Sequence, residues 1–231
     1  MSETMLQISG LVAGYGKNVV VREAALEVGH SKIVGLVGHN GAGKTTLVKS
    51  LNGIVPRRAG DVRLDGAPLP ASPVRAARAG IVLVPQGRGL FPGLSVEDNI
   101  RIGAVAVGRQ IDEEFRSRIV ELFPQLADLF SRRAGHLSGG QQQMVAIARG
   151  LAAGPKVLVV DELSLGLAPV VIDAVWNALT RLRERTEISV LVIDQNLARM
   201  TARCDELYRL EDGRTHLMSA RERQDAGGLI L

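Results

Sequence analysis

The stretch Gly38–Thr45 constrains the fold of this chain more than any other part of its sequence. It reads Gly-His-Asn-Gly-Ala-Gly-Lys-Thr and fits the pattern G-x-x-x-x-G-K-[ST] of a phosphate-binding loop. Residues 32–37 before it are predicted to form a buried strand, and residues 45–51 after it a helix. This order lets successive N–H groups surround one concavity at a helix N-terminus, which attracts phosphate.

The loop pattern assigns a role to each of its residues. Lys44 is predicted to reach the β- and γ-phosphates of a nucleotide, and the Thr45 hydroxyl to bind Mg²⁺. The other residues expected to contact the nucleotide here are Gly38, His39, Asn40, Gly41, Ala42, Gly43 and Thr46. The alternative is a glycine-rich turn that matches by chance, and the strand and helix on either side argue against it.

The charge of the chain gives little support to a nucleic-acid-binding function. Its 231 residues include 28 basic and 24 acidic side chains, a formal net charge of +4. The basic pairs Arg57-Arg58 and Arg132-Arg133 lie far apart in the sequence and have no aromatic residues between them, whereas nucleic-acid sites need clustered positive charge. We interpret these arginines as solvated surface, and the small excess is also compatible with work beside an anionic membrane face.

The cysteine count and the hydropathy pattern limit the other possibilities. Cys204 is the only cysteine, so no internal disulfide can form and a cysteine-based metal site is not expected. Residues 1–4 lack the basic and apolar regions of a signal peptide. No run approaches the ~18 apolar residues of a membrane span. If the protein serves a membrane, we expect it to do so from outside the bilayer.

Hydrophobic periodicity predicts strands that alternate with helices, with a purely helical block from Ser95 to Gly135. Besides 32–37, the predicted strands are 6–8, 19–28, 60–66, 80–85, 156–160 and 188–193, with a hairpin at 206–210 and 215–218. The predicted helices are 45–51, one capped by Ser95, 119–126 with a break at Pro124, one opened by 137–140 and ended by Gly154, and 171–182. This alternation is typical of an α/β fold with a mostly parallel sheet.

Polar side chains follow several of the predicted strands, at the sheet edge where ligands of parallel sheets collect. They are Gln86, Asp161, Glu162 and Gln195. Asp161 closes an apolar strand, as does the Walker B carboxylate that holds Mg²⁺, and Glu162 is placed to act as a general base toward an attacking water. The alternative is that both carboxylates only solvate a strand end.

A second anion-binding pattern lies between the phosphate loop and Asp161. The sequence Leu-Ser-Gly-Gly-Gln-Gln-Gln at 137–143 opens a helix with a serine and two glycines. With these motifs in this order, nearly the whole chain resembles the ATP-binding subunits of ATP-binding cassette (ABC) transporters. A well-capped helix with no binding role is the alternative for the second pattern.

The resemblance implies a P-loop NTPase (RecA-like) fold and a set of residue roles. It implies one ABC ATPase domain over residues 1–231, with an α/β core at about 1–85 and 155–231 that includes an antiparallel β part, and a helical subdomain at about 90–152. Two cassettes pair head to tail in this family. The residues that would cover the partner's γ-phosphate are Ser138, Gly139, Gly140 and Gln141.

Three further roles follow from position in the family pattern. Tyr15 is similar to the aromatic residue that stacks on adenine, with an ordinary edge-strand tyrosine as the alternative. Gln86 is similar to the residue that senses Mg²⁺ and the attacking water, and the helices after it would dock on a membrane subunit. Gln195 occupies the switch position near the γ-phosphate, and residues 164–168 occupy the D-loop position.

Several features resemble the branched-chain amino acid importer subfamily, and within it the shorter of its two cassettes. They are the segments 141–144, 146–149 and 164–169 and the pair Gln195-Asn196. Most cassettes have histidine at 195, aspartate at 168 and proline at 163, where this chain has Gln195, Ala168 and Leu163. The first two departures match the subfamily. Leu163 does not, nor does Gln86, where the subfamily commonly has glutamate. Leu163 is predicted to loosen the turn that positions Glu162 and to slow turnover.

The resemblance implies an ATP- and Mg²⁺-dependent ATPase subunit that acts with membrane permeases and, indirectly, a solute-binding protein at the cytoplasmic face of the cell membrane. Importers of urea and amides share the features of the subfamily. An exporter or lipid-extracting cassette, or a soluble cassette acting on nucleic acid, are alternatives. A GTPase is not expected, because the chain lacks an N-K-x-D guanine motif.

Overall fold

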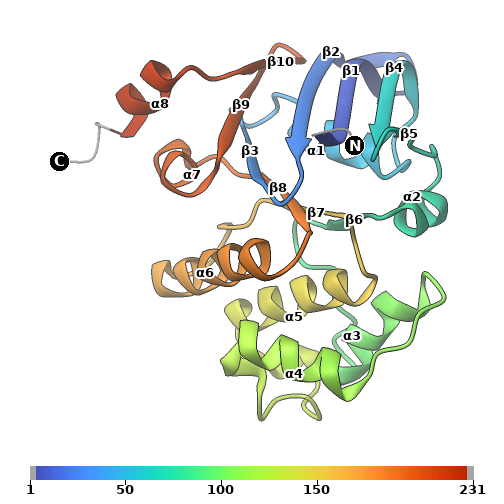
Figure 1. Cartoon of the computed structure of the whole chain (residues 1–231), viewed down its shortest axis with the longest axis vertical. Helices are drawn as coiled ribbons and strands as arrows, with labels where there is room; N and C mark the ends of the chain where they lie inside the picture. Colours follow the sequence, from blue (N-terminus) through green and yellow to red (C-terminus); the bar gives the residue numbers. More distant parts are fainter. Residues whose placement is uncertain (1–3, 228–231) are drawn as a thin grey trace.

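A ten-stranded sheet runs through the molecule in the order β5-β4-β1-β2-β10-β9-β3-β8-β7-β6 (Figure 1). The structure is a computed structural model, and it describes residues 4–227, with the side chains of 226 and 227 left out. The sheet divides into a parallel half and an antiparallel half, which confirms the predicted α/β fold class.

The parallel half holds the strands that precede the candidate site. β9, β3, β8, β7 and β6 are neighbours in this order and pair in parallel. Their bounds are β3 Ile33–Val37, β6 Ile81–Val84, β7 Val157–Asp161, β8 Ser189–Ile193 and β9 Glu206–Glu211. Because parallel strands end at the same edge, this half brings the phosphate loop, Gln86, Asp161 and Gln195 to one edge of the sheet.

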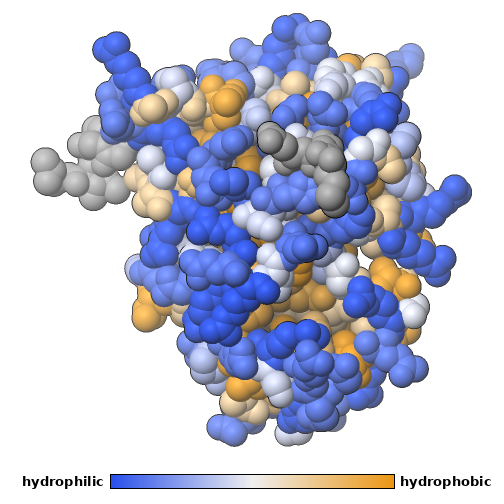
Figure 2. Space-filling model, viewed as in Figure 1, coloured by the Kyte–Doolittle hydropathy of each residue, from blue (hydrophilic) through white to orange (hydrophobic). Residues whose placement is uncertain are grey.

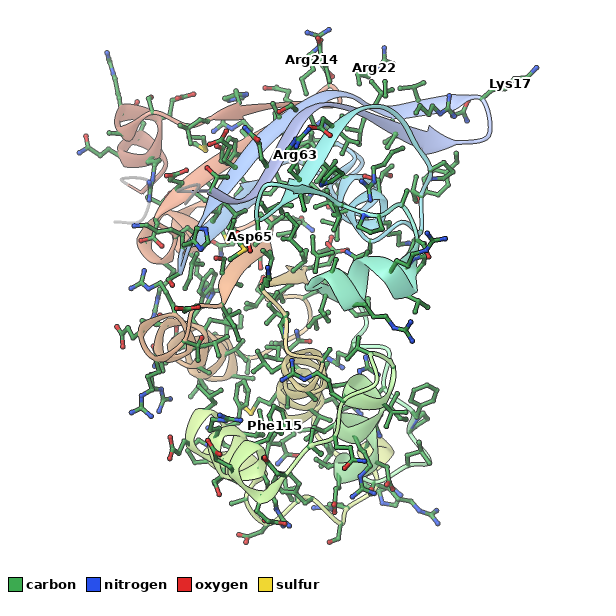
Figure 3. The ribbon with its side chains drawn as sticks, turned by 45° about the vertical axis from the view of Figure 1, so that its right-hand side comes forward. Lys17, Arg22, Arg63, Asp65, Phe115 and Arg214 are labelled. Carbon is green, nitrogen blue, oxygen red and sulfur yellow. The ribbon has the colours of Figure 1, made fainter. Side chains whose placement is uncertain are left out.

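The antiparallel half forms the upper part of Figure 1. Its strands are β1 Thr4–Tyr15, β2 Asn18–Gly29, β4 Arg57–Leu64 and β5 Ala67–Pro68. β10 Arg214–Leu217 joins the two halves, because it pairs antiparallel with β9 and parallel with β2. The predicted hairpin between β9 and β10 is confirmed, with Asp212 and Gly213 at its turn. Figure 3 shows Lys17, Arg22 and Arg214 pointing outward from the edge of this half.

A helical part lies between β6 and β7 and fills the lower half of Figure 1. It consists of α3 Val96–Val105, α4 Glu113–Leu122, two short 3-10 turns at Pro124–Leu126 and Ala134–His136, and α5 Gly139–Ala152. α4 ends before Pro124, because proline cannot donate the next helical hydrogen bond, and the predicted break is therefore confirmed. The exact boundaries of a separate helical subdomain stay a prediction.

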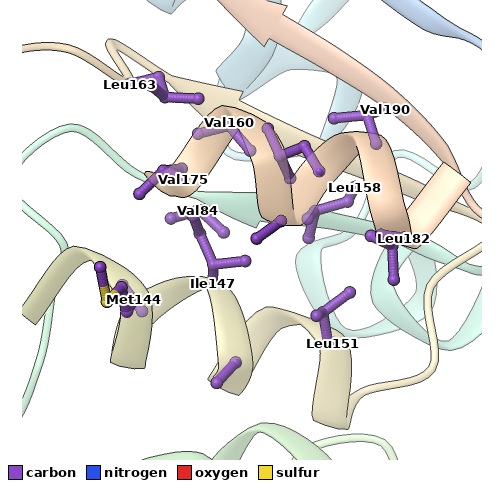
Figure 4. Packing of buried hydrophobic residues seen from close by; sticks show 14 of the residues in the cluster. Val84, Met144, Ile147, Leu151, Leu158, Val160, Leu163, Val175, Leu182 and Val190 are labelled. Atoms are coloured by element: carbon purple, nitrogen blue, oxygen red, sulfur yellow. The ribbon is translucent and has the colours of Figure 1, made fainter. Parts of the chain in front are cut away.

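Both faces of the parallel strands are covered by apolar side chains. In β7, Leu158 and Val160 pack toward α5 and α6 (Pro169–Arg185), whereas Val157 and Val159 pack in the cluster that contains α1 (Lys44–Leu51). Figure 4 shows Ile147 of α5 in the first cluster, close to the β7 side chains. Full burial of one such side chain stabilises the fold by about 1.5–3 kcal/mol, so the strand ends rest on a rigid support.

Three short helices were not predicted from the sequence: α2 Pro73–Ala79, α7 Leu197–Arg203 and α8 Ala220–Gly227. Each is at most eight residues long, which leaves too few apolar positions for a periodic pattern. A local signal exists for α2, because Ser72 precedes Pro73 at the first helical position and Gly80 follows the last. The side chain of Asn196 caps α7 by accepting a hydrogen bond from the N–H of Arg199.

Candidate functional site

The phosphate loop leaves the end of β3 and enters α1 with its N-terminal N–H groups uncovered. Gly41 and Gly43 have φ values of 85° and 105°, a left-handed conformation that glycine adopts without strain. At Gly38, a Cβ atom would lie 2.6 Å from the carbonyl oxygen of Leu210, so no larger residue fits there. No side chain caps α1 and its first turn has no acidic residue, which leaves the helix end free for an anion.

Lys44 is folded back onto the loop and is only 5% exposed. Its Nζ donates hydrogen bonds to the carbonyl oxygens of Gly38 at 2.7 Å and His39 at 3.0 Å. Burial lowers the pKa of the Lys44 ammonium, while Glu162, Asp161 and Asp194 oppose this shift by their negative charge. The ammonium therefore lies in the field of three carboxylates and can turn from the loop carbonyls to a bound phosphate.

Asp161 is the last residue of β7 and is 3% exposed. Burial raises the pKa of its carboxyl group, the charge of Glu162 adds to this shift, and a hydrogen bond with the Thr45 side chain opposes it. Its Oδ1 is buried without a hydrogen-bond partner in the described part of the chain. A buried acceptor without a partner next to a threonine hydroxyl fits a hard cation such as Mg²⁺. Bound between these two residues and a nucleotide, Mg²⁺ would neutralise phosphate charge.

Glu162 is held in a left-handed backbone conformation with φ 52°, and its N–H donates to the Ile193 carbonyl at 2.9 Å. Its carboxylate accepts hydrogen bonds from Gln86 Nε2 at 2.6 Å and from Gln195 Nε2 at 3.5 Å. The structure thus joins three of the predicted residues in one cluster. A carboxylate held by two amides is positioned for general-base work, and backbone strain of this kind is common at functional sites.

Asp194 connects this cluster to the following loops, and the sequence analysis did not assign it a role. It is 4% exposed, and its carboxylate accepts hydrogen bonds from Ser164 N at 3.0 Å and Ser164 Oγ at 2.9 Å. It also accepts from the N–H groups of Gln195 at 2.7 Å and Asn196 at 3.0 Å. Asp194 therefore fixes the start of the D-loop position relative to Gln195. The sequence signal was present, since Asp194 follows an apolar strand as Asp161 does.

Leu163 and Ala168 are two of the positions at which the chain departs from the pattern of most cassettes. Leu163, the residue after Glu162, is fully buried in the core cluster, so the turn after Asp161 is anchored by packing. The slower turnover predicted from Leu163 stays a prediction. Ala168 is the N-cap residue of α6 and provides no side-chain cap.

The predicted signature residues form the capped start of α5. Ser138 Oγ accepts a hydrogen bond from the N–H of Gln141, and the Gln141 side chain accepts one from the N–H of Ser138. This is a capping box, which leaves the serine O–H free to donate to an anion. A Cβ atom at Gly140 would lie 2.5 Å from Val171 Cγ1, so this glycine is also required for packing of α5 on α6.

The signature helix is fastened to the loop after Gln86 by two arginines. Arg149 donates from Nη1 to the Gly89 carbonyl and from Nη2 to the Arg88 carbonyl, both at 2.7 Å. Arg88 in turn donates to Gln142 Oε1 at 3.1 Å, and its guanidinium group lies beside Gly139. No hydrogen bond within residues 4–227 joins the signature to the phosphate loop, and this link connects the signature helix to the loop that follows Gln86.

We expect Arg149→Met to loosen this connection, because both main-chain carbonyls lose a charged donor. Hydrogen bonds to charged groups contribute about 1.5–3 kcal/mol, so the free energy of unfolding is expected to fall by about 2 kcal/mol. Urea unfolding measures the change. Arg101→Met is the matched control, since Arg101 pairs with the exposed carboxylates of Glu97 and Asp98 on its own helix. Equal midpoints for both variants would contradict the expectation.

Tyr15 lies at the end of β1 and is 49% exposed. The turn of this hairpin is confined to Gly16 and Lys17, because Tyr15 still pairs with Asn18. The guanidinium of Arg58 donates to the carbonyl oxygens of Gly16 and Asn18 and thereby fixes the turn. Exposure suits a stacking partner, but among the described residues no hydrogen bond joins Tyr15 to the phosphate loop. Its adenine-binding role stays a prediction.

Comparison with known proteins agrees with this arrangement. The model of the family described as ABC transporter matches residues 21–164. The chain is 37% identical over 211 residues to the high-affinity branched-chain amino acid transport ATP-binding protein BraG of Pseudomonas aeruginosa, covering 91% of this chain and 90% of that protein. The probable branched-chain amino acid transport ATP-binding protein LivF of Archaeoglobus fulgidus is 33% identical over 214 residues, covering 91% of this chain and 89% of that protein.

Similarity extends to an export system and to a solved structure. The lipopolysaccharide export system ATP-binding protein LptB of Escherichia coli is 35% identical over 218 residues, covering 93% of this chain and 89% of that protein. A solved structure of the ATP-binding subunit of an ABC transporter superposes with a TM-score of 0.83 at 27% identity, covering 97% of this chain and 94% of that one. In the part of the chain that the structure describes, no helix is long and apolar enough to cross a membrane.

Proposed function

Since this chain belongs to the ABC transporter family and is an ATP-hydrolysing subunit of it, we propose that it powers an importer of branched-chain amino acids or related small polar solutes. In this proposal it binds Mg-ATP between two cassettes at the cytoplasmic face of the membrane. Binding closes the pair, and hydrolysis reopens it and drives the permease subunits between their two states.

The observation that carries the proposal is the separation of two anion sites on one chain. The phosphate loop has a helix N-terminus without a side-chain cap and the Lys44 ammonium beside it, whereas Ser138 caps the start of a different helix, α5. One chain has one phosphate loop, so the second site has no nucleotide of its own to bind. A head-to-tail pair of cassettes gives each signature a γ-phosphate to cover.

In the proposed reaction, the Glu162 carboxylate removes a proton from the water that attacks the γ-phosphate. Gln86 and Gln195 hold that carboxylate from two sides, at 2.6 and 3.5 Å, and their amides can turn to the water or the phosphate when nucleotide is present. Lys44 and the N–H groups of the loop stabilise the negative charge of the phosphates. Thr45, Asp161 and Gln86 are the proposed residues around Mg²⁺.

ATP favours the closed pair only through contacts that it makes in that state. A ligand shifts an equilibrium by its difference in affinity for the two states. Nucleotide held by one phosphate loop gains the Ser138 hydroxyl and the start of α5 as new donors only after closure. Hydrolysis removes the γ-phosphate that bridges both chains, and the pair opens.

The import assignment is supported by similarity to BraG and LivF and by the residues at 141–144, 164–169 and 195–196. Similarity to LptB keeps an export or lipid-extraction role as the second candidate. A soluble cassette that acts on nucleic acid is less well supported, because the basic residues are scattered and the net charge is only +4.

An apolar groove supports a membrane subunit as partner. It has a volume of about 210 Å³ and lies between β6, α3 and α5. Its small and apolar lining residues include Val82, Leu83, Ile102, Gly103, Ala106, Val107, Ala146, Gly150 and Ala153. On the face in Figure 2, hydrophobic side chains are exposed in a hollow near the place where Figure 1 draws α3 and α5. We propose that a short helix of the permease docks there, next to the loop that contains Gln86.

We expect Ser138→Arg to abolish ATP-driven pairing and most ATP hydrolysis, because a long cation replaces the small donor at the seam. The measurement is light scattering with size-exclusion chromatography in a Glu162→Gln background, with and without ATP. Ser95→Arg is the control, since Ser95 is also the N-cap residue of a helix, α3, and is not among the residues proposed to form the seam. Unchanged pairing in Ser138→Arg would remove the head-to-tail model.

The cargo is tested in host cells by deleting the gene and measuring uptake of labelled leucine, isoleucine and valine. We expect uptake of these amino acids to fall, and to recover with the wild-type gene but not with a Lys44→Ala copy. Unchanged uptake together with a defect in export of lipopolysaccharide would replace the import assignment by the second candidate. Salt-dependent binding of DNA or RNA would favour the nucleic-acid role.

A further inference from the structure

A cavity of about 320 Å³ opens between α4, the end of α5 and the end of α6, away from the phosphate loop and the signature. Its floor is apolar and contains the core residues Ile119, Leu151 and Leu182. Phe115, Leu122 and Ile188 complete it and are only partly buried. In Figure 3, Phe115 lies on the side of α4 that faces the rest of the molecule. Cavities of this size are large enough for a small organic ligand.

The rim of this cavity is cationic. Four arginines and two carboxylates line it, so the formal charge of the rim is positive by two: Arg109, Arg118, Arg181 and Arg185 against Asp112 and Glu121. Two of the arginines are compensated, because Arg185 pairs with Glu121 at 2.9 Å and Arg118 pairs with Glu114 at 3.1 Å.

The other two arginines have no carboxylate partner among residues 4–227. Arg109 is exposed, and its guanidinium lies against Gly154. Arg181 donates only to the main-chain carbonyls of Asn177 at 3.3 Å and Glu121 at 3.4 Å, which are long hydrogen bonds. The Asp112 side chain caps α4, because its carboxylate accepts a hydrogen bond from the N–H of Phe115.

From this combination we infer a binding site for a small amphiphilic anion in this cavity. The ligand has a carboxylate or phosphate group at the two unpaired guanidiniums and an apolar body of about ten heavy atoms on the floor. A guanidinium binds carboxylate and phosphate by the same forked geometry, so the structure assigns the class and not the headgroup. The bound ligand would join α4 to the ends of α5 and α6. The site is independent of the proposed transport function.

Isothermal titration calorimetry on the full chain tests this site with four probes. Octanoate and octyl phosphate share one apolar chain and differ in headgroup. Octyltrimethylammonium has the same chain with the opposite charge, and acetate has the headgroup without the chain. We expect saturable 1:1 binding of one or both octyl anions, and at least about tenfold weaker binding of the cation and of acetate. The tighter octyl anion identifies the headgroup.

Two variants locate the binding. Arg109→Gln and Arg181→Gln are each expected to weaken binding of the octyl anion by about tenfold or more, through loss of a charged hydrogen bond. Arg221→Gln, which removes the same charge from an exposed position on α8, is expected to leave binding unchanged. Urea unfolding confirms that all three variants are folded. Absence of saturable anion binding, equal binding of the cation, or equal affinity in the Arg109, Arg181 and wild-type proteins would overturn the inference.

Discussion

Replacing Glu162 by glutamine is expected to lower the rate of ATP hydrolysis by about 10²–10⁴-fold, the usual contribution of a general base. Glutamine has almost the same shape as glutamate, and its single side-chain oxygen can still accept the hydrogen bond from Gln86. The phosphate loop is untouched by this change. ATP binding is therefore expected to persist, and the nucleotide-bound pair of cassettes to accumulate.

This prediction is checked by steady-state phosphate release and by the mass of the ATP complex in solution. Glu187→Gln is the matched control, because Glu187 is exposed and lies beside the start of β8, at the opposite end from the site. It is expected to hydrolyse ATP at the wild-type rate. If Glu162→Gln also retains the wild-type rate, another group removes the proton from water.

Lys44→Ala is expected to have the second large effect, and it acts on binding. The ammonium is the one charged donor that the loop itself presents to the phosphates, and a hydrogen bond to a charged group is worth about 1.5–3 kcal/mol. The loss of one or two such bonds weakens nucleotide binding by about ten- to a hundredfold or more, since 1.36 kcal/mol is a factor of ten. Hydrolysis falls with it.

Equilibrium binding of a fluorescent ATP analogue measures this change. Lys32→Ala is the control, because Lys32 precedes the start of β3, whose other end leads into the phosphate loop. The Lys32→Ala change removes the same charge, and with it an ion pair between Lys32 and Asp205 at 3.7 Å. Wild-type affinity in Lys44→Ala would mean that the loop main chain alone holds the nucleotide, and the role assigned to Lys44 would be withdrawn.

Helices and strands with a strong apolar pattern could be predicted from the sequence, because burial of their apolar side chains determines where they form. β7 was predicted as an apolar strand and is fully buried, and the helix predicted after 137–140 is α5, which buries Met144, Ile147 and Leu151. The short helices α2, α7 and α8 could not be predicted in this way. Their formation depends on caps and on tertiary contacts, and not on a repeating apolar face.

The residues of the candidate site could be predicted where a chemical role requires a particular type of side chain at a strand end or in a loop pattern. Lys44, Asp161, Glu162, Gln86 and Gln195 were all identified from strand ends and loop patterns, and the structure brings them to one edge of the sheet. Whether these residues perform the roles assigned to them is for the variants above to decide.

Residues that act by holding others were missed. Asp194, Arg88 and Arg149 serve main-chain groups or side chains far away in the sequence, and a carboxylate or guanidinium in isolation gives no sign of such a partner. Asn99 is a further example. It is fully buried, and its side chain accepts a hydrogen bond from the N–H of Phe91 and donates one to the carbonyl oxygen of Phe91. These contacts follow from the way the chain folds back on itself.

The left-handed backbone at Glu162 has a consequence for directed evolution of this protein. A side chain in that conformation costs roughly 1–2 kcal/mol, which glycine avoids and asparagine reduces. A library screened only for survival at high temperature is therefore expected to enrich glycine or asparagine at position 162. The variants selected by such a screen would be more stable proteins that still bind ATP but have lost most of their ATP hydrolysis.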